Sequence, residues 1–130
     1  KVNYLIVGGY ALAFHGAPRT TGDIDILVKP NRGNAKRVVA ALNDFGFRTV
    51  GLTIEDFEKP EKVVQLGVPP VRVDIITSIT GISWKEAWSG KINGHYGDIP
   101  VYYLGRRQFL SNKKAVGRKK DLADMEALEE

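Results

Sequence analysis

Residues 23–28 (DIDILV) alternate acidic and apolar side chains, and this alternation constrains the fold more than any other feature of the chain. Successive side chains of a β-strand point to opposite faces, so the pattern predicts a strand with Asp23 and Asp25 on the same face. Such a strand buries its apolar face under a helix. We therefore expect an α/β (α+β) fold, a small mixed β-sheet with helices packed on it.

Other segments supply the remaining elements of this predicted fold. Four apolar runs are typical of strands, namely residues 4–7, 63–66, 71–76 and 99–103. The proline-containing turn at 67–70 predicts that the second and third of these runs form an antiparallel hairpin. Helices are predicted at 10–15, 34–45 and 84–88, and as two C-terminal segments split by Gly117. In the last segment Leu122, Met125 and Leu128 mark the expected buried stripe.

Size and composition set limits on the class of protein. With 130 residues the chain is large enough for one core, and we predict a single domain, 1–130, with some N-terminal residues trimmed before Lys1. No stretch reaches the roughly 20 apolar residues of a membrane helix, which predicts a cytoplasmic protein without a membrane partner. The absence of cysteine excludes disulfides and thiolate metal sites.

The acidic residues indicate a metal site. Asp23 and Asp25 are expected about 7 Å apart, at roughly 3.3 Å of rise per residue. Such like charges repel unless a cation neutralises them, and carboxylate oxygens favour Mg²⁺ or Mn²⁺ over zinc. Asp74 lies in the apolar run 71–76, where an uncompensated carboxylate is costly. Three carboxylates suit two-ion phosphoryl transfer, whereas Asp23 and Asp25 alone also fit a strand whose acids discourage edge pairing.

Gly8 and Gly9 follow the first strand directly and precede a helix. They predict a tight turn whose backbone N–H groups can approach phosphate, although a glycine pair in this position is by itself a weak signal. The third glycine of a dinucleotide-binding fingerprint is absent. No lysine followed by serine or threonine ends the turn, which excludes a P-loop.

Basic residues are concentrated in the segment Arg106 to Lys120, which holds seven of the 19 lysines and arginines and no acid. The rest of the chain is slightly acidic, although the net charge is +4. The segment predicts either a surface that binds phosphate groups, such as those of RNA, or an ordinary solvated helix face.

Together these segments resemble the nucleotidyltransferase (polymerase beta-like) superfamily, in particular the minimal bacterial nucleotidyltransferases related to the AbiEii-type toxins. The similarity spans most of the chain. It is carried by residues 6–9 (IVGG), 15–16 (HG), 19–22 (RTTG), 23–26 (DIDI), 73–75 (VDI) and 112–124 (NKKAVGRKKDLAD). Lys119 stands where these relatives often have proline.

The resemblance implies an activity, transfer of a nucleoside monophosphate from a nucleoside triphosphate such as ATP to an acceptor hydroxyl. It implies that Asp23, Asp25 and Asp74 are catalytic and bind two Mg²⁺ or Mn²⁺ ions, with Asp74 also taking the proton of the acceptor. Gly8 and Gly9 would position the nucleotide. The acceptor is an RNA end, a protein or a small molecule.

The resemblance also implies lesser roles for other polar residues. Lys113 would contact the triphosphate, and Asp121 belongs to the same late motif. Arg19 and Thr21 are each expected either to shape the loop or to contact the nucleotide. His15 is expected to cap the helix or to pack beside the turn. The implied partners are RNA, including tRNA, through segment 106–120, and a cognate antitoxin protein.

Two other functions compete with this interpretation. A non-catalytic nucleotide-binding or RNA-binding domain would keep the fold, but loss of a carboxylate is its expected sign and all three are present. A metal-dependent glycosyltransferase also uses an Asp-x-Asp pair. The early glycine pair and the small size of the chain argue against it.

Overall fold

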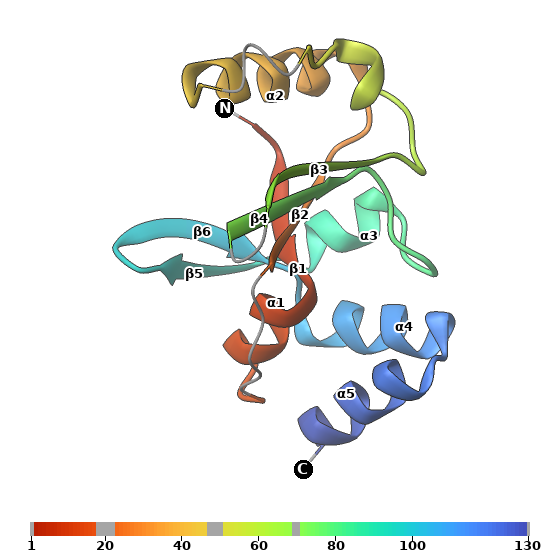
Figure 1. The fold of residues 1–130 in the computed structure, drawn as a ribbon. Helices are drawn as coiled ribbons and strands as arrows, with labels where there is room; N and C mark the ends of the chain where they lie inside the picture. Colours follow the sequence, from red (N-terminus) through yellow and green to blue (C-terminus); the bar gives the residue numbers. More distant parts are fainter. Residues whose placement is uncertain (1, 18–22, 47–50, 69–70, 130) are drawn as a thin grey trace.

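A computed structural model of the chain describes residues 2–17, 23–46, 51–68 and 71–129. Single strands and two-stranded hairpins are interspersed with helices through these ranges, and two helices end them (Figure 1). The strands are β1 (Tyr4–Val7), β2 (Asp23–Val28), β3 (Val63–Val68), β4 (Val71–Ile76), β5 (Ile92–Tyr96) and β6 (Ile99–Tyr103). The helices are α1 (Gly8–Phe14), α2 (Arg32–Asp44), the 3-10 turn η2 (Ile54–Asp56), α3 (Trp84–Ser89), α4 (Arg106–Val116) and α5 (Lys119–Glu129). None of the described helices is long and apolar enough to cross a membrane.

The described strands form one mixed, six-stranded sheet in the order β3-β4-β2-β1-β6-β5. β2 lies between β1, which is antiparallel to it, and β4, which is parallel. The predicted antiparallel hairpin of β3 and β4 is confirmed. β5 was not predicted, and it pairs with β6 across Gly97, whose φ of 62° is left-handed.

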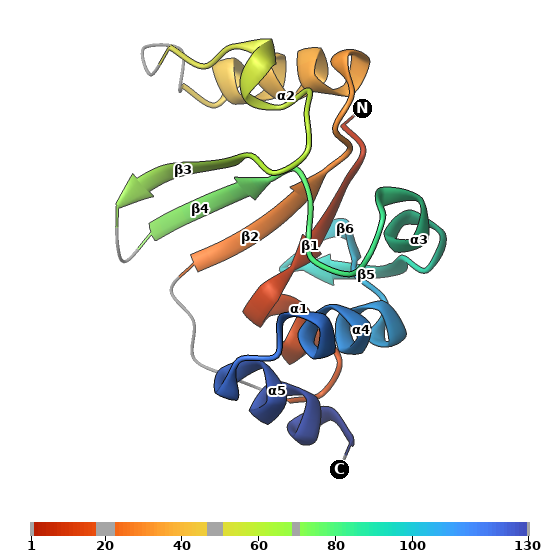
Figure 2. The same cartoon turned by 90° about the vertical axis from the view of Figure 1, so that its right-hand side faces the viewer.

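Helices pack on both sides of the sheet and create two cores (Figures 1 and 2). α2 lies on one side, where Val38 packs with Phe57 and Ile75. α1, α4 and α5 lie on the other, where Leu5 and Phe109 belong to the second core. The carboxyl end of β1 leads directly into α1 on this second side.

Capping residues explain where the helices begin and end. Asn31 precedes α2, and its side chain accepts a hydrogen bond from the backbone N–H of Asn34. Ser83 and Glu86 form a capping box at the start of α3. Gly117 separates α4 from α5, as the sequence predicted, and it has a left-handed φ of 72°.

Two sequence predictions about helices were wrong. Gly8 and Gly9 do not form a separate turn, because they already belong to the first turn of α1. Of the apolar stripe predicted for α5, Leu128 is buried in the core, but the prediction is wrong for Leu122, which is 50% exposed. Asp121 and Asp124 of the same helix are also buried, because the Lys113 ammonium group pairs with both of them.

Candidate active site

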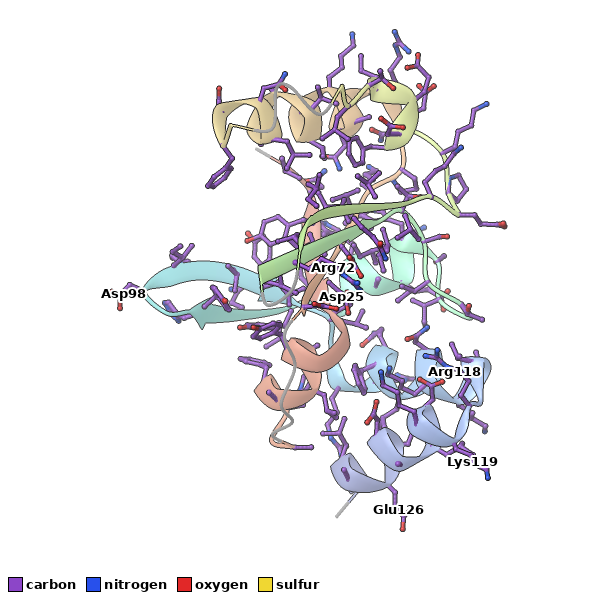
Figure 3. The ribbon with its side chains drawn as sticks, viewed as in Figure 1. Asp25, Arg72, Asp98, Arg118, Lys119 and Glu126 are labelled. Carbon is purple, nitrogen blue, oxygen red and sulfur yellow. The ribbon has the colours of Figure 1, made fainter. Side chains whose placement is uncertain are left out.

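Asp23, Asp25 and Asp74 share one face of the sheet because β2 and β4 are parallel neighbours. Asp25 is in register with Asp74, and Asp23 is in register with Arg72. Paired residues point to the same face, as do residues two apart on a strand. The structure therefore brings together the three carboxylates that the sequence singled out, and it adds Arg72 to them. Figure 3 shows Arg72 beside Asp25.

Arg72 lies between Asp23 and Asp74. Its Nη2 is 2.9 Å from Asp23 Oδ2, and its Nε is 3.1 Å from Asp74 Oδ1. Nη2 also donates a hydrogen bond of 3.2 Å to Asp74 Oδ2. The Arg72 side chain is 29% exposed, so these ion pairs are partly shielded from water. One guanidinium thus neutralises part of the charge of the three acids.

Asp25 is half-buried beside these ion pairs. Burial, followed by the charges of Asp74 and Asp23, raises the pKa of its carboxyl. The positive charges of Arg72 and Lys113 act in the opposite direction. The ionised form of Asp25 is therefore held in an unfavourable environment until further positive charge arrives.

Gly8 leaves the space that the Asp25 carboxylate occupies. The preceding residue, Val7, is in register with Asp25, and a Cβ atom on Gly8 would lie 2.2 Å from Asp25 Oδ2. Gly8 also has a left-handed φ of 67°. Glycine is required here by the carboxylate and by the backbone. Gly9 follows at the same end of β1.

A cluster of four charged residues joins α4 to α5 and is called here the α4–α5 ion cluster (Lys113, Arg118, Asp121 and Asp124). Lys113 Nζ lies 3.2 Å from Asp121 Oδ1 and 3.5 Å from Asp124 Oδ2. Arg118 Nε lies 2.7 Å from Asp121 Oδ2, and the Arg118 backbone N–H donates to the same oxygen. Hydrogen bonds from Arg118, and then from Lys113, hold the pKa of Asp121 well below its usual range.

Burial limits what Asp121 can do. Its side chain is 0% exposed, and both of its oxygens already accept hydrogen bonds. Asp121 therefore cannot face a ligand directly, and its carboxylate pairs with the Lys113 ammonium group instead. The sequence did not single out Asp124. The signal for it was its spacing of three residues from Asp121, which places both acids on one face of a helix.

Other predicted site residues fall outside this arrangement. Arg19 and Thr21 lie outside the described residues. His15 Nε2 is 2.7 Å from the backbone oxygen of Leu104, which agrees with the structural role predicted for it. Lys119 is the first residue of α5, a position that favours proline.

The basic segment 106–120 is divided between internal and external roles. Lys113 and Arg118 belong to the α4–α5 ion cluster, and Arg106 Nη2 donates to the backbone oxygen of Leu128. A groove of about 450 Å³ lies between α4 and α5, with Arg107 and Lys114 on its wall. We call it the basic groove, and it is lined by Arg106, Arg107, Leu110, Ser111, Lys114 and Met125.

The donor set of the carboxylate face suits a hard divalent cation. Its ligands are carboxylate oxygens, and Asp74 Oδ1 is buried without a hydrogen-bond partner, as expected of an oxygen that can bind a cation. As they stand, no three of the acidic or histidine side chains in the described ranges converge closely enough to ligate one ion. The Arg72 guanidinium contacts both Asp23 and Asp74 in this arrangement.

Comparisons with known proteins show the fold. No protein-family model and no curated protein sequence matches the chain. A candidate nucleotidyltransferase from Thermotoga maritima matches with a TM-score of 0.61 and 18% identity over 97% of this chain and 81% of its own. The lincosamide antibiotic adenylyltransferase LnuA, solved with lincomycin bound, matches with a TM-score of 0.53 and 14% identity over 98% and 86%. The predicted nucleotidyltransferase fold is confirmed for the mixed six-stranded sheet.

Proposed function

We propose that the chain is a metal-dependent nucleotidyltransferase, which transfers a nucleoside monophosphate from a nucleoside triphosphate to an acceptor hydroxyl. The observation that carries this proposal is the position of Asp23, Asp25 and Asp74 on one face of a nucleotidyltransferase-like fold. The acceptor oxygen forms a bond to the α-phosphorus, and the bond to pyrophosphate breaks. The proton of the acceptor passes to a carboxylate, for which Asp74 is our candidate.

Asp23, Asp25 and Asp74 would hold two Mg²⁺ or Mn²⁺ ions, which their oxygen donors suit. When bound, such ions neutralise triphosphate charge and activate the acceptor hydroxyl. The raised pKa of Asp25 supports this role, because a carboxylate that is half-buried and lies beside other acids gains from added positive charge.

Gly8, Gly9, Lys113, Arg19 and Thr21 are our candidates for nucleotide binding. Gly8 gives Asp25 its space, and the charge of Lys113 acts on Asp25 and so on the same site. Asp121 would keep Lys113 in position. Arg19 and Thr21 are proposed from the sequence alone.

Replacing Gly8 by alanine should reduce nucleotidyl transfer by at least about 100-fold, because the new methyl group would displace the Asp25 carboxylate. Gly46→Ala is the matched control, since Gly46 also has a left-handed φ (98°) but a Cβ atom added to it would meet nothing within 4 Å. Each variant should lose about 1 kcal/mol of stability from backbone strain. Equal transfer rates for the two variants would show that Asp25 does not need its present position.

RNA is the acceptor that the basic groove favours. A cognate antitoxin protein remains a prediction from the resemblance alone. Arg106, Arg107 and Lys114 supply three cations, and none of the described residues that line the groove is acidic. Phosphodiester groups are bound by such surfaces in a salt-dependent way. Arg118 does not line the groove, and its guanidinium is paired with Asp121.

Replacing both Arg107 and Lys114 by alanine should weaken RNA binding. It should also make the negative slope of log K against log salt shallower by about 1.4, at roughly 0.7 for each lost phosphate contact. Triphosphate affinity should not change. The matched control is Lys36→Ala with Arg37→Ala, which removes two exposed cations from α2. An unchanged slope in the groove variant would favour a protein or small-molecule acceptor.

The direct test is to incubate the protein with each α-labelled triphosphate, Mg²⁺ or Mn²⁺, and either total RNA or cell lysate. We expect label in one class of acceptor. Label in a small molecule instead of RNA would place the chain closer in function to an antibiotic adenylyltransferase such as LnuA. The absence of label from every acceptor, with triphosphate still bound, would favour the non-catalytic alternative.

A further inference from the structure

The Arg72 guanidinium occupies the position between Asp23 and Asp74. Arg72 comes from β4, two residues before Asp74 and in register with Asp23, so the strand geometry alone directs it between these acids. Its nitrogen atoms lie 2.9 Å from Asp23 and 3.1 Å from Asp74. A divalent ion held by the same oxygens would have to share this space with a positive charge.

Of the two contacts between the Arg72 guanidinium and the Asp74 carboxylate, one is a hydrogen bond, from Nη2 to Oδ2 at 3.2 Å, and the other is not. Arg72 Nε and Asp74 Oδ1 are 3.1 Å apart, yet each is buried without a hydrogen bond of good geometry. The two groups are therefore attracted by charge while a donor and an acceptor stay unsatisfied. Such a contact is easier to exchange for another cation than a fully formed bidentate pair.

We infer that Arg72 is a built-in counter-ion that competes with divalent metal for Asp23 and Asp74, and that it leaves these carboxylates when metal binds. The inference rests on the proposed function only for the identity of the metal ligands. It explains why no three of the described acids converge on one point, although they share one face of the sheet. Arg72 is therefore a residue that sets metal affinity.

Metal binding to the protein without nucleotide tests this role. The protein is titrated with Mn²⁺, and free Mn²⁺ is followed by electron paramagnetic resonance for wild type, Arg72→Met and Arg32→Met. We expect Arg72→Met to lower the Mn²⁺ dissociation constant by roughly 10-fold or more, because the competing charge is gone. Arg32→Met is the matched control and should match wild type, since Arg32 is 61% exposed and pairs only weakly with Glu58 at 3.4 Å.

Thermal unfolding gives a second measurement. Without metal, Arg72→Met should melt at a lower temperature than wild type, because Asp23 and Asp74 lose their ion pairs with the guanidinium. Saturating Mn²⁺ should then raise its melting temperature by more than that of wild type. Should Arg72→Met not fold without metal, Arg72→Lys keeps the charge but cannot reach both carboxylates with a planar fork, and we expect a smaller gain in Mn²⁺ affinity.

Mn²⁺ affinity that is unchanged or weaker in both Arg72→Met and Arg72→Lys would overturn the inference. The proposed function would still stand if wild type bound Mn²⁺ and transferred nucleotide. Failure of wild type and both variants to bind Mn²⁺ would overturn the inference together with the assignment of metal to Asp23, Asp25 and Asp74. Label transfer without any requirement for metal would reject the metal dependence of the function separately.

Discussion

Replacing Asp25 by asparagine is expected to abolish nucleotidyl transfer and to raise the melting temperature of the metal-free protein. Transfer should fall by at least about 1000-fold, because a charge that holds the metal is lost. The protein should become more stable because burial and two neighbouring acids disfavour the ionised form of Asp25.

The pH dependence of this stability follows from the sign of the pKa shift. The pKa of Asp25 is raised in the folded state, so wild type loses stability as the pH rises through the unfolded and then the folded pKa. The advantage of Asp25→Asn should therefore be full at neutral pH and disappear in acid, where both proteins are uncharged at this position. Melting curves at several pH values measure the difference.

Asp74→Asn should lose transfer to the same extent as Asp25→Asn. Asp98→Asn is the control, because Asp98 is exposed in the turn between β5 and β6, away from Asp25 (Figure 3). Transfer rates near wild type in both Asp25→Asn and Asp74→Asn would reject the proposed catalytic residues.

Replacing Asp121 by asparagine should lower the free energy of unfolding by about 3 kcal/mol and the melting temperature by roughly 10 °C. This substitution leaves Lys113, which is 12% exposed, with Asp124 as its remaining carboxylate in the α4–α5 ion cluster. The expected loss is at the low end for a broken buried pair, because Arg118 is 65% exposed and water screens its charge.

The effect of Asp121→Asn should also depend on pH. The pKa of Asp121 is depressed, so its stabilisation is complete above the unfolded pKa, about 4, and is lost as the pH falls toward the folded value. Denaturant unfolding at pH 7 and at pH 3 measures this change. Glu126→Gln is the control, since Glu126 is exposed on the same helix (Figure 3). Equal stability of the two variants at pH 7 would show that the cluster does not hold α5.

The strands that the sequence predicted are those whose own side chains alternate or are continuously apolar. β1, β2, β4 and β6 have the predicted boundaries. β5 (INGHY) lacks both patterns, and it becomes a strand because it pairs with β6. Gly94 within it permits close contact, since a Cβ atom there would lie 2.7 Å from Phe14 and 2.9 Å from Tyr103. Contacts of this kind depend on the folded chain.

The candidate site was likewise predictable only in part. Asp23, Asp25 and Asp74 were visible because acids stand out on apolar strands. Arg72 occupies the same face as Asp74, but its contact with Asp23 depends on the register of β4 against β2. That register cannot be predicted from the sequence. Asp121 was expected among the nucleotide-binding residues, whereas the structure buries it against Lys113 and Arg118. Hydrophobic periodicity could not predict that α5 turns acids inward.

A double-label transfer assay tests the central claim most directly. Once an acceptor is found, the protein is supplied with triphosphate labelled at the α-phosphorus and, separately, at the γ-phosphorus. Nucleotidyl transfer predicts that the acceptor gains α label, that γ label leaves as pyrophosphate, and that the two appear in equal amounts. Recovery of γ label in the acceptor would contradict the account, because it would identify a phosphotransferase.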